Sequence, residues 1–304
     1  MISQAVKEAL QRFVPVENIL YKEPLKQYTT FRVGGEADCM IDITDSAQLS
    51  GLLQYLSKVE IPYFVLGNGS NLLAGDKGYR GIVLRISDKI ADIRVEGNRI
   101  YAKAGAYLSR VAKTAEEHGL TGLEFAAGIP GTVGGGVVMN AGAYDGEMKQ
   151  VVEEVTVLDG EGNSLTLDNE TMEFGYRTSA IKQHPFIVTE CCFLLKEGDR
   201  TAIREKMAEF QRRRKEKQPL EFPSAGSTFK RPEGHFAGKL IMDAGLSGFQ
   251  TGGAQVSEKH CGFVINTGDA TAADIRGLIS HVQEEVYRQF SVKLEPEVIF
   301  LGEF

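Results

Sequence analysis

The sequence has no tryptophan, only nine prolines and only four cysteines among its 304 residues. With 42% hydrophobic and 25% charged residues, the composition excludes a disordered or low-complexity chain. A chain of this length buries about three quarters of its unfolded surface, so it needs no disulfide or metal for stability. Acidic residues outnumber basic ones by 41 to 34, which gives a net charge of −7. This balance argues against a protein that binds nucleic acid through bulk positive charge.

The cysteines form no C-x-x-C pair, and two of them, Cys191 and Cys192, are adjacent. Zinc sites need spaced ligands, so we expect no metal and free, buried thiols in a reducing cytoplasm. The first ten residues carry Lys7 and Glu8 and lack the apolar core of a signal peptide. Phe125–Tyr144 is uncharged and long enough to span a membrane, but its glycines would make a poor helix. We therefore expect a cytoplasmic protein without a membrane anchor.

Alternating strand and helix patterns predict an α+β fold. Turn residues at Glu96–Asn98 and Asp159–Gly162 predict two hairpins, Ile90–Val95 with Arg99–Ala104 and Val151–Leu158 with Ser164–Leu167. The remaining strands are expected at Ala37–Ile43, Tyr63–Leu66, Gly81–Ile86, Phe186–Leu195, Gln255–Ser257, Gly262–Asn266 and Val298–Leu301. Helices are expected at Ser3–Phe13, from Asp45 or Ser46 to about Lys58, and at Tyr107–His118, Thr201–Lys217, Phe236–Ala244 and Thr271–Phe290.

Glycine is abundant, with 34 residues, and two loops concentrate it. The first, Gly67-Asn-Gly-Ser-Asn71, begins like a dinucleotide-binding fingerprint but has Leu72 where the third glycine should stand. The second is Gly128-Ile-Pro-Gly-Thr-Val-Gly-Gly-Gly136, and no Walker A loop occurs anywhere. Either these segments are only tight turns, or their side-chain-free amides bind an anion such as a pyrophosphate.

These motifs resemble the UDP-N-acetylenolpyruvoylglucosamine reductases, flavoenzymes of peptidoglycan synthesis. The resemblance rests on segments along nearly the whole chain: Tyr28-Thr-Thr-Phe-Arg-Val-Gly-Gly35, Leu66-Gly-Asn-Gly-Ser-Asn-Leu-Leu73, Ala127–Gly135 with Asn140–Ala143, Phe174-Gly-Tyr-Arg177, Pro223–Lys230 and Leu294-Glu-Pro-Glu-Val298. It implies a two-lobed FAD-binding fold of the vanillyl-alcohol-oxidase (PCMH) type plus a smaller α/β substrate-binding domain. The implied FAD is non-covalent and NADPH is the co-substrate. The implied FAD-binding residues are Gly67, Asn68, Gly69, Ser70, Asn71, Gly128, Ile129, Pro130, Gly131, Thr132, Gly134, Gly135, Asn140 and Ala141.

The same resemblance implies three domains. Residues 1–85, with 291–304 returning to them, would form the first FAD-binding lobe. Residues 86–205 would form the second lobe, and residues 206–290 the substrate-binding domain.

The implied reaction reduces the enolpyruvyl ether of a UDP-sugar to a lactyl ether, with hydride added at C3 and a proton at C2. Ser227 matches the family's proton donor, although a serine this near Pro223 is also typical of a turn without a catalytic role. Arg177 matches the catalytic arginine, which can drain charge from the enolate through the substrate carboxylate. Glu297 matches the catalytic glutamate, and Glu295 is its natural internal control.

Lys217 matches a substrate-binding lysine, while the rest of the Arg212–Lys217 cluster is expected to be a solvated helix face. Tyr176, Lys230 and His260 are the other candidate substrate contacts. Only 50 residues separate Arg177 from Ser227, so the chain resembles the compact subclass that lacks an additional tyrosine loop. Ile299 stands where some members carry an arginine.

Two other functions remain open. The first is an FAD-linked oxidase of the same fold, although neither glycine loop contains a histidine to attach the flavin covalently. The second is a non-catalytic sugar-nucleotide sensor, which would be expected to lack one of Arg177, Ser227 and Glu297.

Overall fold

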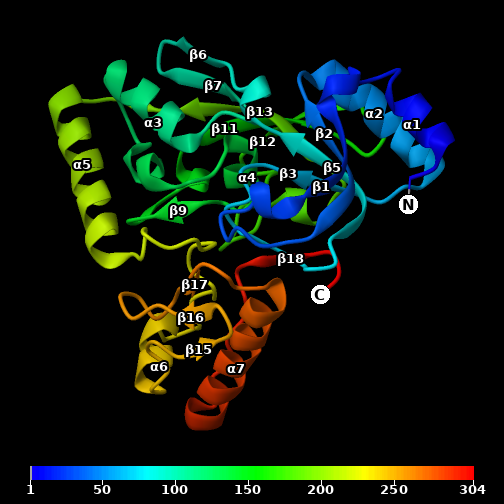
Figure 1. Ribbon diagram of the computed structural model, residues 1–304. Coiled ribbons are helices and arrows are strands. Elements are labelled where there is room, and N and C mark those ends of the chain that lie inside the picture. The colour runs from blue at the N-terminus through cyan, green and yellow to red at the C-terminus, as the bar shows by residue number, and fades with distance from the viewer. Residues whose placement is uncertain (1) are drawn as a thin grey trace. The chain divides into compact units, whose positions relative to one another are not determined.

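The computed structural model describes residues 2–304, which form two compact units (Figure 1). The first unit comprises the described residues up to Tyr21, together with Cys39–Asn68 and Gly81–Arg214. The second comprises Lys22–Asp38, Gly69–Arg80 and Lys215–Phe304. Each unit has its own hydrophobic core of buried residues.

A five-stranded antiparallel sheet forms the centre of the first unit. Its order is β12 (Ser164–Asp168), β11 (Val152–Leu158), β13 (Ile187–Leu194), β7 (Arg99–Lys103) and β6 (Ile93–Glu96). Both predicted hairpins are confirmed. The first begins at Ile93 because Asp88–Ile90 forms a 3₁₀ turn. The central place of β13, with both faces covered, explains its long apolar run.

The second main sheet has the order β1 (Ile19–Pro24), β2 (Glu36–Ile43), β5 (Tyr79–Ile86) and β3 (Tyr63–Leu66). Strand β1 was not predicted, because Lys22, Glu23 and Pro24 interrupt its apolar pattern. Helix α2 (Ser46–Val59) begins where expected, since the Asp45 carboxylate accepts a 2.8 Å bond from the Gln48 amide. It buries four leucines at helical spacing, namely Leu49, Leu52, Leu53 and Leu56. Helix α1 (Gln4–Leu10) is capped by Ser3.

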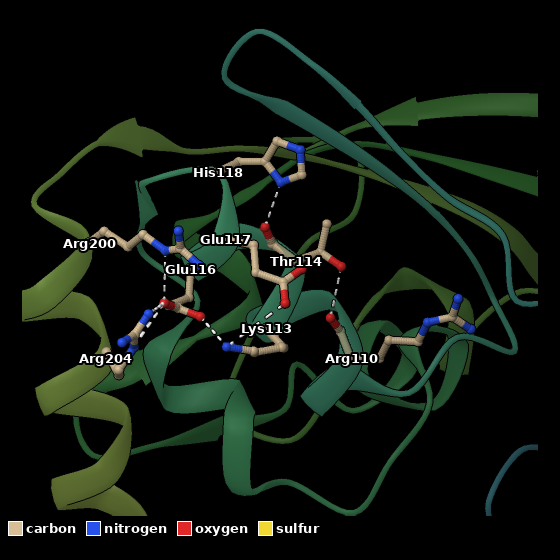
Figure 2. Close-up of polar contacts among 8 residues, drawn as sticks. All are labelled: Arg110, Lys113, Thr114, Glu116, Glu117, His118, Arg200 and Arg204. Atoms are coloured by element: carbon tan, nitrogen blue, oxygen red, sulfur yellow. Dashed lines mark hydrogen bonds and ion pairs between the residues drawn. The ribbon is translucent and has the colours of Figure 1, made fainter.

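Helices α3 (Leu108–Glu117) and α5 (Arg200–Lys217) are tied together by one buried carboxylate (Figure 2). The Glu116 side chain is only 1% exposed. It accepts bonds from Arg204 Nη2 at 2.8 Å and Arg200 Nε at 3.1 Å, and from Lys113 Nζ. These cations hold the pKa of Glu116 down at about 2, with Lys113 the largest cause and Arg204 the next. Glu116 is thus the electrostatic link between the two helices.

The glycine-rich stretch after α3 is not a simple loop, which corrects the expectation from composition. It contains a 3₁₀ turn (Glu124–Gly128) and a short helix, α4 (Val133–Val138), with three glycines. The helix forms because tertiary bonds hold its backbone, including Gly134 N to Ala104 O at 2.9 Å. Strands β9 (Gly142–Ala143) and β10 (Gly146–Glu147) follow as a hairpin, and Met148–Gln150 forms another 3₁₀ turn.

The second unit contains a small antiparallel sheet covered by helices (Figure 1). Its strands are β15 (Gln250–Thr251), β16 (Ala254–Val256) and β17 (Val264–Asn266). Helices α6 (Ala237–Asp243) and α7 (Ala272–Phe290) pack beside it. The Asp76 carboxylate accepts 2.8 Å bonds from the amides of Ala272 and Ala273, a long-range cap on α7 that the sequence does not disclose.

The remaining elements are short. Strands β4 (Leu72–Ala74) and β18 (Ile299–Leu301) pair in parallel, and β8 (Leu120–Thr121) pairs with β14 (Lys196–Glu197). Further 3₁₀ turns lie at Val16–Asn18, Leu25–Gln27 and Ala180–Lys182.

The four cysteines are free and buried, as predicted. Burial raises the pKa of Cys192 to about 12, so this thiol is not a nucleophile at neutral pH. No helix between residues 2 and 304 combines the length and the apolar character needed to cross a membrane. In the same range, no cluster of three or more His, Cys, Asp or Glu side chains is arranged to hold a metal ion.

Candidate active site

The two glycine loops meet in the first unit. Asn68 Nδ2 donates a 2.6 Å bond to the carbonyl oxygen of Pro130. A Cβ added to Gly67 would lie 2.7 Å from Thr132 Oγ1, so a larger residue here would force the Thr132 side chain to shift. The start of the first loop and the middle of the second therefore lie in direct contact. The rest of the first loop, Gly69–Asn71, belongs to the second unit.

Neighbouring glycines in α4 face different surroundings. A Cβ on Gly136 would lie 3.0 Å from Leu108 Cδ1, and one on Gly134 would lie 3.1 Å from the Ala104 Cβ. These two positions pack against the core. Gly135 is exposed, and its added Cβ would have only Thr132 Oγ1, at 3.7 Å, within 4 Å. The backbone at Gly135 thus borders open space where a ligand can approach it.

One arginine of the Arg212–Lys217 cluster lies beside the second glycine loop. Arg214 is half-buried, whereas the other five residues of the cluster are exposed. Its Cδ and Nη1 atoms lie 3.4 Å from the position of a Cβ on Gly128. Burial lowers the pKa of Arg214. The expectation that Arg214 belongs to a solvated helix face is therefore wrong, and its spacing of four residues from buried Phe210 indicates the inner face of α5.

Arg177 occupies the tip of a tight turn. Gly175 and Thr178 exchange backbone hydrogen bonds of 3.1 and 3.3 Å, which leaves Tyr176 and Arg177 as the two tip residues. Arg177 has φ 56°, a left-handed conformation that is uncommon for a residue with a side chain. Its Nη2 donates to the Gly142 carbonyl oxygen at 3.3 Å, and its guanidinium carbon lies 5.3 Å from the centre of the Tyr176 ring.

The Tyr176 ring is exposed, and the turn presents it together with the guanidinium. A third predicted site residue, Asn140, is buried and donates its side-chain amide to Gly175 O at 3.0 Å. Ala141 is half-buried beside it, and its amide donates to Gly136 O at 2.8 Å.

Ser227 and Glu297 lie on paired segments of the second unit. The amide of Glu297 donates a 2.8 Å bond to the carbonyl oxygen of Thr228, the residue after Ser227. Thr228 is fully buried, and its hydroxyl accepts a 2.9 Å bond from the amide of Val264 on β17. Thr228 was not among the predicted site residues, because an isolated threonine carries no signal of this role. Ser227 itself is exposed and Glu297 is half-buried.

Two further contacts support this pair of segments. Asn71 Nδ2 donates to the Glu297 carbonyl oxygen at 3.0 Å, so this loop residue positions the segment that carries Glu297. Lys230 and Glu295 form a 3.0 Å ion pair on the same segments. Glu295 is 71% exposed, which distinguishes it from Glu297.

His260 and Lys217 also belong to the second unit. Burial lowers the pKa of His260, and its Nδ1 accepts a 3.1 Å bond from the Gly262 amide. Nδ1 therefore carries no proton in the neutral ring, and Nε2 carries it. Lys217 is exposed at the last residue of α5.

Comparison with known protein families gives two matches, one to residues 37–168 and one to residues 218–301. Residues 37–168 match the family described as FAD binding domain. Residues 218–301 match the family described as UDP-N-acetylenolpyruvoylglucosamine reductase, C-terminal domain. A reductase of that name from Caldanaerobacter subterraneus subsp. tengcongensis is 49% identical over 302 residues, which cover 99% of this chain and 100% of the relative. The chain belongs to the UDP-N-acetylenolpyruvoylglucosamine reductase family.

Other relatives agree with this membership. The UDP-N-acetylenolpyruvoylglucosamine reductase of Clostridium botulinum is 51% identical over 286 residues, covering 94% of this chain and 93% of the relative. The crystal structure of the reductase from Thermus caldophilus superposes with a TM-score of 0.81 at 38% identity, covering 92% of this chain and 98% of that one. Membership in the reductase family confirms the expected oxidoreductase class, with FAD as cofactor and NADPH as co-substrate.

More distant structures bear on the fold alone. Wild-type Phl p 4.0202, a glucose dehydrogenase, has a TM-score of 0.52 at 15% identity, over 65% of this chain and 45% of that one. Together with the FAD binding domain match, this confirms the FAD-binding fold that the resemblance implied.

Proposed function

We propose that the chain reduces UDP-N-acetylglucosamine enolpyruvate to UDP-N-acetylmuramate, a precursor of peptidoglycan, in the cytoplasm. The observation that carries this proposal is the pairing of the Ser227 and Glu297 segments through the bond between Thr228 O and Glu297 N. It supplies a hydroxyl and a carboxyl group on adjacent backbone within the second unit. Family membership supplies the substrate class, a UDP-sugar.

The residues of the two glycine loops fit a bound dinucleotide. Gly135 borders open space, and close packing at Gly67 and Gly134 leaves room for backbone but not for side chains. Backbone amides of such turns bind the phosphate groups of anions, and the Arg214 guanidinium beside Gly128 adds positive charge. We assign FAD to the implied residues of these loops, Gly67–Asn71, Gly128–Thr132, Gly134 and Gly135. Bound FAD supplies the hydride that NADPH provides.

Ser227 is the proton donor to C2 in this proposal. A serine hydroxyl is a weak acid, but the carbon that it protonates is strongly basic once C3 has received hydride. Arg177 would bind the substrate carboxylate and stabilise the negative charge that develops on the enolate. Glu297 would orient the developing enol or return a proton to Ser227.

Tyr176, Lys217, Lys230 and His260 are proposed substrate contacts. Lys217 and Lys230 carry charge suited to the diphosphate, and Tyr176 offers an exposed ring. We retain the three expected domains, 1–85 with 291–304, 86–205 and 206–290, as part of the proposal. FAD would bind to the first two and the UDP-sugar to the third.

An anaerobic experiment with two half-reactions tests the proposal. NADPH is added to the purified, FAD-loaded protein, and bleaching of the flavin absorbance is recorded. UDP-N-acetylglucosamine enolpyruvate is then added without air. Rapid return of the oxidised spectrum is the expected result. Return only after air is admitted would instead favour an oxidase of the same fold.

A further inference from the structure

Arg177 is held in its uncommon backbone conformation by contacts from outside its own turn. Gly175 and Thr178 form the base of the turn and exchange the two backbone hydrogen bonds described above. A left-handed conformation at a residue with a side chain persists where the surroundings fix it.

The Asn140 side chain reaches that base. It is 1% exposed, and its Nδ2 donates to the carbonyl oxygen of Gly175 at 3.0 Å. The same nitrogen donates to Glu147 Oε2 at 3.1 Å, and Oδ1 accepts from the amide of Lys149 at 2.9 Å. An amide nitrogen carries two protons, so both are used. The three partners also fix the orientation of the amide, because exchanging its oxygen and nitrogen would place oxygen against two acceptors.

The partners of Asn140 belong to the segment that also holds the arginine itself. Glu147 ends β10, and Gly142, whose carbonyl oxygen accepts from Arg177 Nη2, begins β9 in the same hairpin. Asn140 thus joins the base of the turn to the hairpin, while Arg177 bonds the other strand of that hairpin. Base and tip of the turn are fixed to one small element.

We propose that Asn140 is a positioning residue for Arg177, which acts through the turn and not through a side-chain contact with FAD. This inference rests on the catalytic role proposed for Arg177. It differs from the expectation that Asn140 is a cofactor-binding residue, because both of its side-chain amide protons already have protein acceptors. Displacement of a catalytic group by about 1 Å costs about 10²-fold in rate, so a fixed turn has a large catalytic value.

The test uses Asn140→Asp, with Asn169→Asp as the matched control. Aspartate keeps the shape of asparagine and tolerates the left-handed φ of 42° at this position. It replaces the donating nitrogen with an oxygen that faces the Gly175 carbonyl oxygen and the Glu147 carboxylate. Asn169 is half-buried, and its side-chain amide donates to two backbone carbonyls, those of Lys149 at 2.9 Å and Val152 at 2.6 Å. If Asn140→Asp does not fold, Asn140→Gly serves, since glycine accepts this φ without strain.

Three quantities are measured: FAD affinity, flavin reduction by NADPH, and flavin reoxidation by substrate. We expect Asn140→Asp to slow reoxidation by substrate at least about 10-fold and to change FAD affinity less than about threefold. Asn169→Asp should leave both the reoxidation rate and the FAD affinity nearly unchanged. In an Arg177→Lys background, Asn140→Asp should add less than about a further threefold, because the two residues act as one unit.

Several results would overturn the inference. A parallel loss of FAD affinity would return Asn140 to the cofactor site. If Asn140→Asp slows reoxidation equally in the wild-type and Arg177→Lys backgrounds, Asn140 acts independently of Arg177. If Asn140→Asp and Asn169→Asp slow reoxidation equally, Asn140 has only a general structural role. If Arg177→Lys alone leaves reoxidation unchanged, the proposed role of Arg177 fails, and this inference fails with it.

Discussion

Glu297 donates its backbone amide to the carbonyl oxygen of Thr228, at 2.8 Å, so the two proposed catalytic groups of the second unit lie on paired segments. Thr228 is buried, and its hydroxyl in turn accepts the amide of Val264. Ser227 is thereby placed one residue from a fully bonded anchor. An exposed hydroxyl beside such an anchor has the rigid support that proton transfer requires.

Ser227→Ala tests the proton donor. Removing a positioned acid costs about 10²-fold or more in the step that needs it. We expect reoxidation of the reduced flavin by substrate to slow by at least about 10²-fold, while reduction by NADPH stays nearly unchanged. Stopped-flow absorbance under anaerobic conditions measures both rates. Equal slowing of both half-reactions would contradict the role of Ser227.

Glu297→Gln tests the carboxyl group, and Glu295→Gln is its control. The two residues are neighbours on one segment, but Glu295 is 71% exposed and pairs with Lys230, whereas Glu297 is half-buried. An exposed ion pair contributes little, about 0–1 kcal/mol. We therefore expect Glu297→Gln to harm the substrate half-reaction far more than Glu295→Gln. Matching losses in the two variants would leave Glu297 without a special function.

Gly135→Ala separates cofactor binding from folding. The α4 position of Gly135 has open space, and alanine in a helix is more favourable than glycine by about 0.5–1 kcal/mol. The FAD-free protein should therefore keep or raise its melting temperature. If FAD approaches this backbone, the affinity of the Gly135→Ala protein for FAD should fall by about tenfold or more, which corresponds to about 1.4 kcal/mol or more of binding free energy. Fluorescence titration with FAD measures the affinity.

Gly136→Ala gives the opposite pattern and serves as the comparison. Its added Cβ would lie 3.0 Å from Leu108 Cδ1, so we expect lower stability of the FAD-free protein. Unchanged FAD affinity in Gly135→Ala would mean that FAD does not approach the backbone of α4 at this position.

The local pattern of the sequence predicted most helices and strands, because burial follows hydrophobic spacing. The four leucines of α2 and the long apolar strand β13 are examples. Strand β1 was not predicted because it carries charged residues and lies at the edge of the sheet. Its extended conformation depends on pairing with β2, which the local sequence pattern does not reveal. Helix α4 was not predicted because glycine has a low helix propensity, and tertiary hydrogen bonds such as that from the Gly134 amide to the Ala104 carbonyl oxygen outweigh it.

The candidate site was predicted as residue types, not as contacts. The motifs named Asn140 and Asn71, but the hydrogen bonds of their side chains to Gly175 and Glu297 connect positions 35 and 226 residues apart. Sequence spacing predicts contacts within one helix or hairpin, but not between residues this far apart. The Asp76 cap of α7 is a similar long-range contact.

Glu116 makes the stability of the first unit depend on pH at the acid end. Lys113, Arg204 and Arg200 lower the pKa of its carboxyl group from 4.5 to about 2 (Figure 2). Because the folded pKa lies below the unfolded one, the unfolded chain binds the proton first as pH falls. The stabilisation is fully present above about pH 4.5 and disappears as pH falls towards about 2.

Glu116→Gln, with Glu117→Gln as control, tests this dependence. Glutamine keeps the acceptor oxygen but removes the charge that attracts two arginines of α5, so we expect a lower melting temperature at neutral pH. The deficit relative to the wild type should shrink as pH falls from about 4.5 towards about 2, since the unfolded wild-type chain takes up the proton and the stabilisation from the charge is lost. Glu117 is half exposed, and its carboxylate lies 3.8 Å from Lys113 Nζ, so its substitution should change little. Thermal unfolding at several pH values measures both variants, and a deficit for Glu116→Gln that stays constant with pH would show that packing, not charge, links α3 to α5.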